Sequence, residues 1–353
     1  MSKIHIHQTM SLTPEQYIAG LTDFSAGRAE VFSKSADDYL KVHSVSSTEA
    51  DVTELLSPAD AVEAVEACFH RLAAGEIENV PRQRTRWEEG FLAVMWAVDR
   101  ELGLAGLKTY AAGREGVHFV VLLFETETTE NVAVIEADKL GQLRTGAASG
   151  VAAKHLAREG ASTLGVIGCG WQARSQVAAI REALPTIETV VAYCRSEERL
   201  AEFCREVGAE PGESHRDPAS QEVVVTVTTS RDPVLRGEWL RAGALVCAVG
   251  ANDPRRRELD NVVLERAAFV CCDSIEDARR ESGDLIEPVE AGVLDWLEVH
   301  ELQEVVGGQV SGRQSDEDIV VFKSNGLAAW DVAIGAAALE RARERGVGTQ
   351  LEV

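Results

Sequence analysis

Three basic residues in the first half of the chain could bind and protonate an anionic substrate: Arg84, Lys108 and Arg144. A guanidinium is planar and can meet a carboxylate with two parallel hydrogen bonds, so Arg84 and Arg144 suit a carboxylate site. Lys108 is flanked by leucines and a tyrosine, which favours a buried functional lysine. A partly desolvated lysine beside arginines has a lowered pKa and could transfer a proton near neutral pH.

Other arginines lie close to these three in the sequence. We expect Arg82, Arg86 and Arg114 to be solvated surface charges, which is the usual environment of an arginine.

A glycine-rich turn supplies a second kind of chemistry. A short apolar run ends at Gly168 and is followed by Cys-Gly170-Trp171-Gln172-Ala173 and a helix-compatible segment, which predicts a strand, a tight turn and a helix. In this G-x-G-x-x-A arrangement Gly168 permits the turn, Gly170 lets backbone N–H groups approach a pyrophosphate, and Ala173 lets the helix pack closely. Its place between strand and helix favours dinucleotide binding over an ordinary turn.

The composition is that of a globular protein long enough for two domains. The chain has 353 residues, of which 45% are hydrophobic and 26% charged, and Asp and Glu outnumber Lys and Arg 58 to 35. The formal net charge of −23 argues against nucleic acid or a membrane surface as a partner. Any anionic ligand therefore needs a local cluster of cations.

Cysteine usage and hydropathy indicate a cytoplasmic protein. The seven cysteines are odd in number and show no C-x-x-C spacing, which favours reduced thiols over disulfides or zinc, and no metal is expected. No apolar run approaches the roughly 18 residues of a membrane span. The N-terminus MSKIHIHQTM lacks the apolar core of a signal peptide.

Hydrophobic patterning changes along the chain. A helix is expected from Thr13 to Leu21, another from Ser57 to near Gly75, and a last one from Leu327 to Arg345. Short β-like runs at 82–87, 91–98, 104–110, 117–125 and 131–136 predict an antiparallel meander. After Gly141, strands are expected at 164–168, 189–194, 223–229, 245–250, 269–273 and 319–322, with helices between several of them.

This alternation predicts an α/β fold: a Rossmann-type doubly wound parallel sheet plus a mainly antiparallel α+β domain for substrate binding and dimerisation. The meander has too little helix to cover both of its faces. An uncovered apolar face and free strand edges predict a homodimer.

Four motifs in order carry a family resemblance. They are RTGAASG at 144–150, the glycine turn, DS followed by ESGDL at 273–285, and VFKSNGLA at 321–328 with Asp331. Together they resemble the ornithine cyclodeaminase/mu-crystallin family, from about Leu56 to about Ala342. The resemblance implies an N-terminal extension at 1–55, a substrate-binding and dimerisation domain at 56–143 with 327–353, and a dinucleotide-binding Rossmann domain at 144–326.

The resemblance also implies roles for individual residues. Arg84 and Arg144 correspond to arginines that hold the substrate's α-carboxylate, and Lys108 to the lysine near the reacting carbon. Arg144 and Thr145 would form an anion-binding helix start beside the cofactor. The remaining cofactor contacts implied in this way, at the ribose and nicotinamide, are Thr229, Ser324 and Gly326.

The residues after the second strand of the Rossmann unit bear on cofactor choice. An NAD site usually has an acid there, against the ribose hydroxyls, and the chain instead reads Tyr193-Cys-Arg195-Ser196. Arg195 and Ser196 could hold a 2′-phosphate, which favours NADP over NAD, although NAD stays possible because Arg195 could also be an exposed loop residue.

Departures from the family pattern limit the functional interpretation. The position of the cyclodeaminases' catalytic aspartate is Asn252, which offers only hydrogen bonds, and the adjacent Asp253 is expected to point elsewhere. The family's Pro-x-Asn after the lysine strand is absent, so the resemblance does not assign the substrate's side chain. Trp171 replaces a small residue inside the glycine turn.

The sequence therefore predicts an NAD(P)H-dependent oxidoreductase acting at the C–N bond of a small α-imino or α-amino acid. A reductase of Δ1-pyrroline- or Δ1-piperideine-2-carboxylate is the first interpretation, and an amino-acid dehydrogenase is the second. Two alternatives stay open: an ornithine or lysine cyclodeaminase that recycles NAD, and a crystallin-like NADPH-binding protein without turnover.

Overall fold

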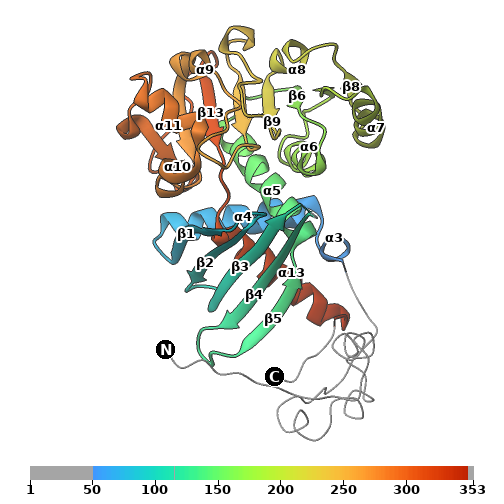
Figure 1. The fold of residues 1–353 in the computed structure, drawn as a ribbon, viewed down its shortest axis with the longest axis vertical. Helices are drawn as coiled ribbons and strands as arrows, with labels where there is room; N and C mark the ends of the chain where they lie inside the picture. Colours follow the sequence, from blue (N-terminus) through green and yellow to red (C-terminus); the bar gives the residue numbers. More distant parts are fainter. Residues whose placement is uncertain (1–50, 115, 349–353) are drawn as a thin grey trace, which may run out of the picture. The chain divides into compact units, whose positions relative to one another are not determined.

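The computed structural model describes residues 51–114 and 116–348, so the helix expected from Thr13 to Leu21 lies outside the described residues. Residues 51–341 form one compact unit that contains two β-sheets and the helices packed on them (Figure 1). The domain boundaries expected at 56, 144 and 327 fall within or beside this unit and stay a prediction.

The first sheet is an antiparallel meander whose strands pair in chain order. Its strands are β1 (Ile77–Arg86), β2 (Phe91–Asp99), β3 (Leu104–Gly113), β4 (Gly116–Glu125) and β5 (Asn131–Glu136). Strand β1 starts before the predicted run because a β-bulge between Val80 and Gln83 takes up Pro81, which cannot donate a ladder hydrogen bond.

Two long helices pack against the inner face of this sheet, α4 (Pro58–Ala73) and α13 (Ala328–Arg345) (Figure 1). A capping box between Ser57 and Asp60 starts α4, as the sequence predicts. Small residues let α13 approach the strands: a Cβ at Gly106 would lie 2.7 Å from Val332 Cγ2. The rings of Phe69 and Trp330 meet edge to face at 5.5 Å and join the two helices.

The second sheet is parallel and has eight strands in the order β12-β11-β13-β10-β9-β6-β7-β8. Its strands are β6 (Thr163–Ile167), β7 (Thr189–Tyr193), β8 (Glu210–Pro211), β9 (Val223–Thr226), β10 (Leu245–Ala248), β11 (Ala267–Cys272), β12 (Val299–Glu301) and β13 (Ile319–Lys323). The predicted Rossmann-type α/β fold is confirmed. The strands β8 and β12 are too short to stand out in the sequence.

Helices connect these strands. They are α5 (Asp138–Leu156), α6 (Trp171–Ala183), α7 (Glu197–Val207), α8 (Arg216–Ala219), α9 (Asn261–Arg266), α10 (Ile275–Glu281), α11 (Gly283–Glu290) and α12 (Leu302–Val306), with 3-10 turns η1 (Gly237–Trp239) and η2 (Trp296–Glu298) and a short leading helix α3 (Val52–Leu55). Central strands covered on both faces need continuous apolar runs, and β9 and β10 are buried at every position.

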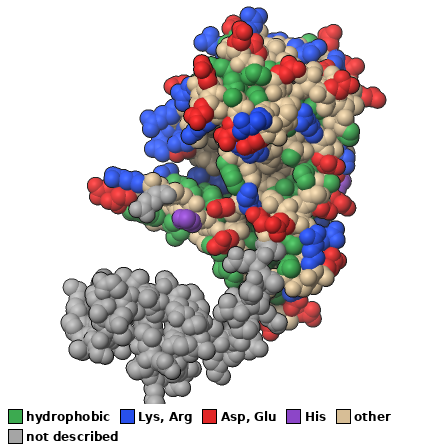
Figure 2. Space-filling model, turned by 90° about the vertical axis from the view of Figure 1, so that its right-hand side faces the viewer, with side chains coloured by type: hydrophobic (Ala, Val, Ile, Leu, Met, Phe, Trp, Pro, Cys, Tyr) green, Lys and Arg blue, Asp and Glu red, His purple; other side chains and the backbone are tan. Residues whose placement is uncertain are grey.

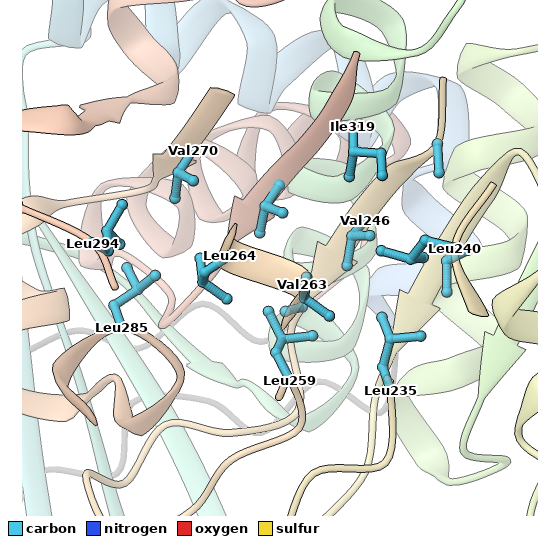
Figure 3. Close-up of a cluster of buried hydrophobic side chains, with 14 of the residues drawn as sticks. Leu235, Leu240, Val246, Leu259, Val263, Leu264, Val270, Leu285, Leu294 and Ile319 are labelled. Carbon is cyan, nitrogen blue, oxygen red and sulfur yellow. The ribbon is translucent and has the colours of Figure 1, made fainter. Parts of the chain in front are cut away.

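One face of the parallel sheet packs against helices α9 and α11 and the loops beside them. Figure 3 shows the cluster, which contains Val246, Val270 and Ile319 from three strands together with Leu259 and Val263. This branched aliphatic layer fixes the strands whose carboxyl ends carry the polar residues described below.

Within the described part of the chain, no helix combines the length and the apolarity that a membrane crossing requires. All seven cysteines are free, and six of them are buried.

Candidate active site

The carboxyl edge of the parallel sheet is where the polar residues of interest gather. Strand β6 lies between β7 and β9. After β6 the chain adds β7 and β8 on one side, and then crosses to add β9 and β10 on the other side. In open α/β sheets a ligand binds at such a switch point, outside the carboxyl ends of the strands. The loops that start at Gly168, Cys194, Val227, Val249 and Ser324 all emerge at this edge.

The glycine turn after β6 has the geometry that a dinucleotide needs. Gly168 has φ 109°, donates its N–H to Tyr193 O at 2.9 Å, and a Cβ there would lie 2.6 Å from Val227 O. Gly170 precedes α6 without a side-chain cap, and a Cβ at Gly170 would meet no atom within 4 Å. The uncapped N–H groups of α6 therefore face open space, which fits a pyrophosphate. Ala173 is fully buried, as close helix packing requires.

The first residue of α6, directly after the glycine turn, contacts helix α5. Trp171 is 50% exposed, and Lys139 Nζ lies 4.5 Å from the centre of its ring. Gln142 donates a hydrogen bond to Trp171 O. Gln172, also expected beside the cofactor, lies in the first turn of α6. A large indole in place of a small residue thus stands at the surface of the turn and does not fill it.

The expectation that Arg144 and Thr145 lie at a helix start is wrong. Helix α5 begins at Asp138, and Thr145 Oγ1 donates to Gly141 O at 2.7 Å, inside the helix. Residues 138–143 continue the helix toward the N-terminus, so the backbone N–H groups at 144 and 145 are not free for an anion. Arg144 can act only through its side chain.

The glycines of the 144–150 motif serve helix packing. A Cβ at Gly146 would collide with the backbone of Ser175, and one at Gly150 would lie 2.9 Å from Ala179 O. Helices α5 and α6 can therefore approach closely. Gln176 Nε2 donates to Thr145 O at 3.1 Å across the same contact.

Lys108 and Arg144 meet on one buried carboxylate, that of Asp331. Lys108 Nζ lies 2.9 Å and Arg144 Nε 3.2 Å from the same oxygen, Asp331 Oδ1. The residues are 2%, 8% and 1% exposed, respectively. Three elements that are distant in the sequence, β3, α5 and α13, thus place two cations and one anion together. The sequence motif contains Asp331 but does not reveal this contact.

Lys108 is the residue best suited to proton transfer. Its ammonium lies 5.0 Å from the centre of the Phe119 ring. Burial lowers the pKa of Lys108 to about 8, the Asp331 carboxylate opposes this decrease, and Arg144 adds to it. The lysine is therefore protonated at neutral pH and close to its titration range.

The third cation of the predicted site, Arg84, belongs to a neighbouring network. Its Nη1 lies 2.5 Å from Glu281 Oε1 and its Nη2 donates to Asn252 O at 3.2 Å. Asn252 is exposed, so its amide side chain borders solvent at the end of β10. The adjacent Asp253 pairs with Arg255 at 2.7 Å and is not part of the cluster of Lys108, Arg144 and Asp331, in agreement with the expectation that it points elsewhere.

Arg82 is not the surface charge that we expected. It is 6% exposed, forms an ion pair with Glu281 and donates to Asn325 O at 3.1 Å. Arg82 and Arg84 lie two residues apart on β1, so both side chains project from one face of the strand and reach the same Glu281 carboxylate. Arg86 and Arg114 are exposed, as expected.

A buried carboxylate organises the loop after β13. Asp273 Oδ2 accepts from Ser324 Oγ at 3.0 Å, Asn325 N at 2.7 Å and Gly326 N at 2.6 Å. The polar groups of Ser324 and Gly326 are therefore used within the protein. Burial raises the pKa of Asp273, and burial and Asp273 together raise the pKa of Asp277 to about 6.

A second network, absent from the sequence-based site, holds the loops after β9 and β10. Lys323 Nζ, fully buried, lies 3.1 Å from Asp284 Oδ2 and donates to Ala251 O at 2.6 Å. Glu258 accepts from Gly250 N at 2.7 Å and from the hydroxyl of Thr228 at 2.8 Å. The predicted Thr229 is exposed, one residue beyond. The sequence shows that some of these charged residues lie in the family motifs, but which of them pair with one another depends on the fold.

The loop after β7 presents Arg195 and Ser196 at the surface. The Ser196 hydroxyl caps α7 by accepting from Arg199 N at 3.3 Å. The imidazole of His215 meets the Tyr193 ring at 4.7 Å, and nearby Arg195 adds to the effect of burial in lowering the pKa of His215. Arg195 therefore lies at the surface, directly after the second strand of the Rossmann unit.

No group of three or more His, Cys, Asp or Glu side chains among residues 51–114 and 116–348 could hold a metal ion.

The open space at Gly170 gives a direct test of cofactor binding. We expect Gly170→Ala to leave the melting temperature unchanged, because the new Cβ meets no atom, and to weaken NADPH or NADH binding about tenfold or more by blocking approach to the N–H groups of α6. Fluorescence titration of the cofactor and thermal unfolding measure the two effects. Gly165→Ala is the contrasting variant, since its Cβ would collide with the backbone of Pro218 and lower stability. Unaltered cofactor affinity in Gly170→Ala would place the pyrophosphate elsewhere.

Comparison with known proteins places this arrangement in a family. The profile of the ornithine cyclodeaminase/mu-crystallin family matches residues 42–346. The chain is 36% identical over 317 residues to alanine dehydrogenase of Archaeoglobus fulgidus, which covers 86% of this chain and 97% of that protein.

Two solved structures show the same fold. The Δ1-pyrroline-2-carboxylate reductase of Thermococcus litoralis, in complex with NADH and L-proline, has a TM-score of 0.81 and 32% identity and covers 85% of this chain and 98% of its own. An archaeal alanine dehydrogenase dimer with bound NAD has a TM-score of 0.80 and 34% identity. The match covers 85% of this chain and 96% of the dehydrogenase chain. With its glycine turn, its buried lysine–arginine pair and these relatives, the chain belongs to the ornithine cyclodeaminase/mu-crystallin family.

Proposed function

We propose that this protein is a nicotinamide-dependent oxidoreductase that acts at the C–N bond of a small α-imino or α-amino acid. Reduction of a cyclic ketimine such as Δ1-pyrroline-2-carboxylate or Δ1-piperideine-2-carboxylate is the activity we place first. One observation carries the proposal: Lys108 and Arg144 lie together in a buried cluster that reaches the carboxyl edge of a dinucleotide-binding sheet. A Cβ at Gly326, in the loop after β13, would collide with Arg144 Nη1.

The cations divide the work of binding and proton transfer. Asp331 engages Nε of Arg144, so the terminal amino groups of the guanidinium can bind the substrate carboxylate. Arg84 supplies a further cation beside Asn252. Lys108, protonated at neutral pH, gives its proton to the substrate nitrogen during reduction and takes it back during amine oxidation.

The glycine turn, together with the loops after β7 and β13, would hold the cofactor. When bound, a nicotinamide dinucleotide supplies or accepts the hydride at the substrate carbon. The relatives contain NADH or NAD, and we propose that this chain instead prefers NADP, because Arg195 and Ser196 stand where an NAD enzyme has an acid.

A cyclodeaminase is the alternative that the site supports less well. Moving protons on and off two amines requires a base near the α-carbon in addition to the cofactor, and Asn252 is only a hydrogen-bonding amide. A crystallin-like role without turnover is also less favoured, because a binding protein has no need of a buried lysine near its titration range. Measuring NADPH and NADH oxidation with a panel of cyclic imines, and of keto acids plus amines, tests the proposed reductase directly.

The outer face of the five-stranded sheet supports a homodimer. A row of apolar residues crosses the sheet in register: Val80 pairs with Trp96, Trp96 with Leu107, Leu107 with Leu122 and Leu122 with Val134. Trp96 and Val134 are 39% and 55% exposed. A similar archaeal alanine dehydrogenase was solved as a dimer. We propose that a second copy of this chain covers the row.

The pKa of Lys108 gives the first prediction for this function. Its value in the folded protein is about 8, so imine reduction, which needs the ammonium, should be constant below pH 8 and its kcat/KM should fall about tenfold for each pH unit above it. Lys108→Ala should lower kcat by about 10²–10⁴-fold and remove this dependence. Arg144→Ala should act mainly on KM, at a cost of about 2–5 kcal/mol. Steady-state NADPH oxidation measures both variants.

Two outcomes would contradict this assignment. If both variants keep wild-type activity, the site lies elsewhere. If the protein forms proline and ammonia from L-ornithine with catalytic NAD, it is a cyclodeaminase.

Cofactor preference gives the second prediction. We expect NADPH to be used better than NADH, and Arg195→Asp to shift the ratio of kcat/KM values about ten- to a hundredfold toward NADH, since a charge-assisted hydrogen bond is lost and a ribose acceptor is gained. Arg241→Asp makes the same change of charge at the amino end of β10 and should leave the ratio unaltered. Better use of NADH by the wild-type protein would refute the preference.

Dimerisation gives the third prediction. Light scattering at micromolar concentration should report a dimer for the wild-type protein and a monomer for Trp96→Glu/Val134→Glu, because two buried carboxylates would be placed in the apolar row. Leu297→Glu is the matched control. Leu297 is 88% exposed and lies outside the five-stranded sheet, so this variant should remain dimeric. A monomeric wild-type protein would rule out the proposed surface.

A further inference from the structure

Asp331 has an unusual place among the charged residues of the site. It lies in the first turn of α13, is 1% exposed, and its Oδ1 accepts from both Lys108 Nζ at 2.9 Å and Arg144 Nε at 3.2 Å. Its Oδ2 has no hydrogen-bond partner within the described residues. The positive end of the α13 dipole favours a carboxylate at this position. One oxygen therefore serves both cations that we assign to the substrate.

The environment of Arg144 limits where its side chain can go. Its guanidinium carbon lies 5.7 Å from the centre of the Trp330 ring, and Gly326 leaves room for Nη1, because a Cβ at this glycine would collide with it. Since Asp331 takes Nε, the two terminal amino groups form the edge left for a carboxylate.

The groups around Lys108 show which effects the Asp331 carboxylate has to offset to keep the lysine charged. The charged or titratable groups that face it are Asp331 on α13, Arg144 on α5, Arg82 on β1 and Tyr110 on β3 itself. Burial, Arg144 and Arg82 all disfavour the ammonium form, and Asp331 is the anion that favours it. Without Asp331, the lysine would lose its proton at a lower pH.

We propose that Asp331 is the positioning residue of this site: its carboxylate keeps Lys108 in the charged form that can donate a proton and fixes Arg144 so that its terminal amino groups meet the substrate carboxylate. This inference rests on the proposed oxidoreductase function and adds to it the residue that sets the usable pH range. Asp331 does not need to touch the substrate for this role.

The test is Asp331→Asn, assayed by imine-dependent NADPH oxidation from pH 5 to 10. Removing an opposite charge in contact with a lysine lowers its pKa by about 1–3 units, so the pH at which kcat/KM begins to fall should move from about 8 toward acid by that amount. Activity at pH 8 should therefore fall by about 5–500-fold and recover at pH 5.5 to within about fourfold of the wild type. A merely structural defect would lower activity at every pH. A decrease that still begins near pH 8 would overturn the proposal.

A binding experiment without turnover separates this inference from the proposed function. Pyrrole-2-carboxylate, a planar carboxylate, is titrated into the cofactor-free protein by calorimetry in buffers of different ionisation enthalpy. An anion bound beside Lys108 raises the lysine pKa, so proton uptake should be largest near or just above pH 8 in the wild type and should move about 1–3 units toward acid in Asp331→Asn. If the wild type binds the probe in this way but reduces no imine, the proposed function fails and the role of Asp331 is supported. An uptake maximum at the same pH in both proteins would contradict that role.

Control variants account for folding. Asp99→Asn removes the carboxylate of another buried ion pair, with Arg71 at 2.8 Å, outside the site, and should lower thermal stability while leaving the pH profile unaltered. If circular dichroism shows that Asp331→Asn does not fold, Arg144→Gln replaces it, because removing the competing cation should move the fall in kcat/KM to a pH above that of the wild type. An unaltered pH profile in folded Arg144→Gln would then refute the electrostatic coupling of Lys108 to the charged residues around it.

Discussion

Pairing of buried charges is the constraint on which the rest of this structure depends. A charged group removed from water is stable only when an opposite charge and hydrogen bonds replace its hydration. Lys108 and Arg144 share Asp331, Arg82 and Arg84 share Glu281, and Lys323 pairs with Asp284. Losing one partner of such a pair typically costs about 3–5 kcal/mol. Each pair also joins elements that are far apart in the sequence, so the same contacts that stabilise the fold align the candidate site.

The carboxylates of the parallel sheet have a related task, which is to shape loops. Asp273 collects the backbone N–H groups after β13, and Glu258 those after β10. Loops usually satisfy their N–H groups with water, whereas these loops keep fixed positions at the carboxyl edge. The edge therefore offers preformed geometry to a cofactor, and the glycine turn leaves open the space a pyrophosphate would need. Preformed sites of this kind lower the ordering cost of binding.

The charge distribution reconciles an acidic protein with an anionic ligand. The net charge is −23, and on the face drawn in Figure 2 acidic and basic side chains alternate over most of the surface, with Lys and Arg side chains beside a hollow. Because salt and solvent screen surface charges over about 8–10 Å, the local cations decide what binds. Their carboxylate partners reduce the positive charge enough for burial, and the guanidinium and ammonium groups keep donors for a substrate.

The sequence by itself determined the fold class, the longer strands and the glycine turn, because hydrophobic periodicity and glycine conformation are local properties. It also identified Lys108, Arg84 and Arg144 as candidates, through residue chemistry and family resemblance. Only the tertiary structure decided that Arg82 is buried, that Arg144 lies inside a helix, and that Asp331 joins Lys108 to Arg144. The β-bulge in β1 and the ion pair between Lys323 and Asp284 likewise cannot be predicted from the sequence. The physical reason is that burial and charge pairing are set by contacts between residues far apart in the chain, such as Lys108 and Asp331, which are 223 positions apart.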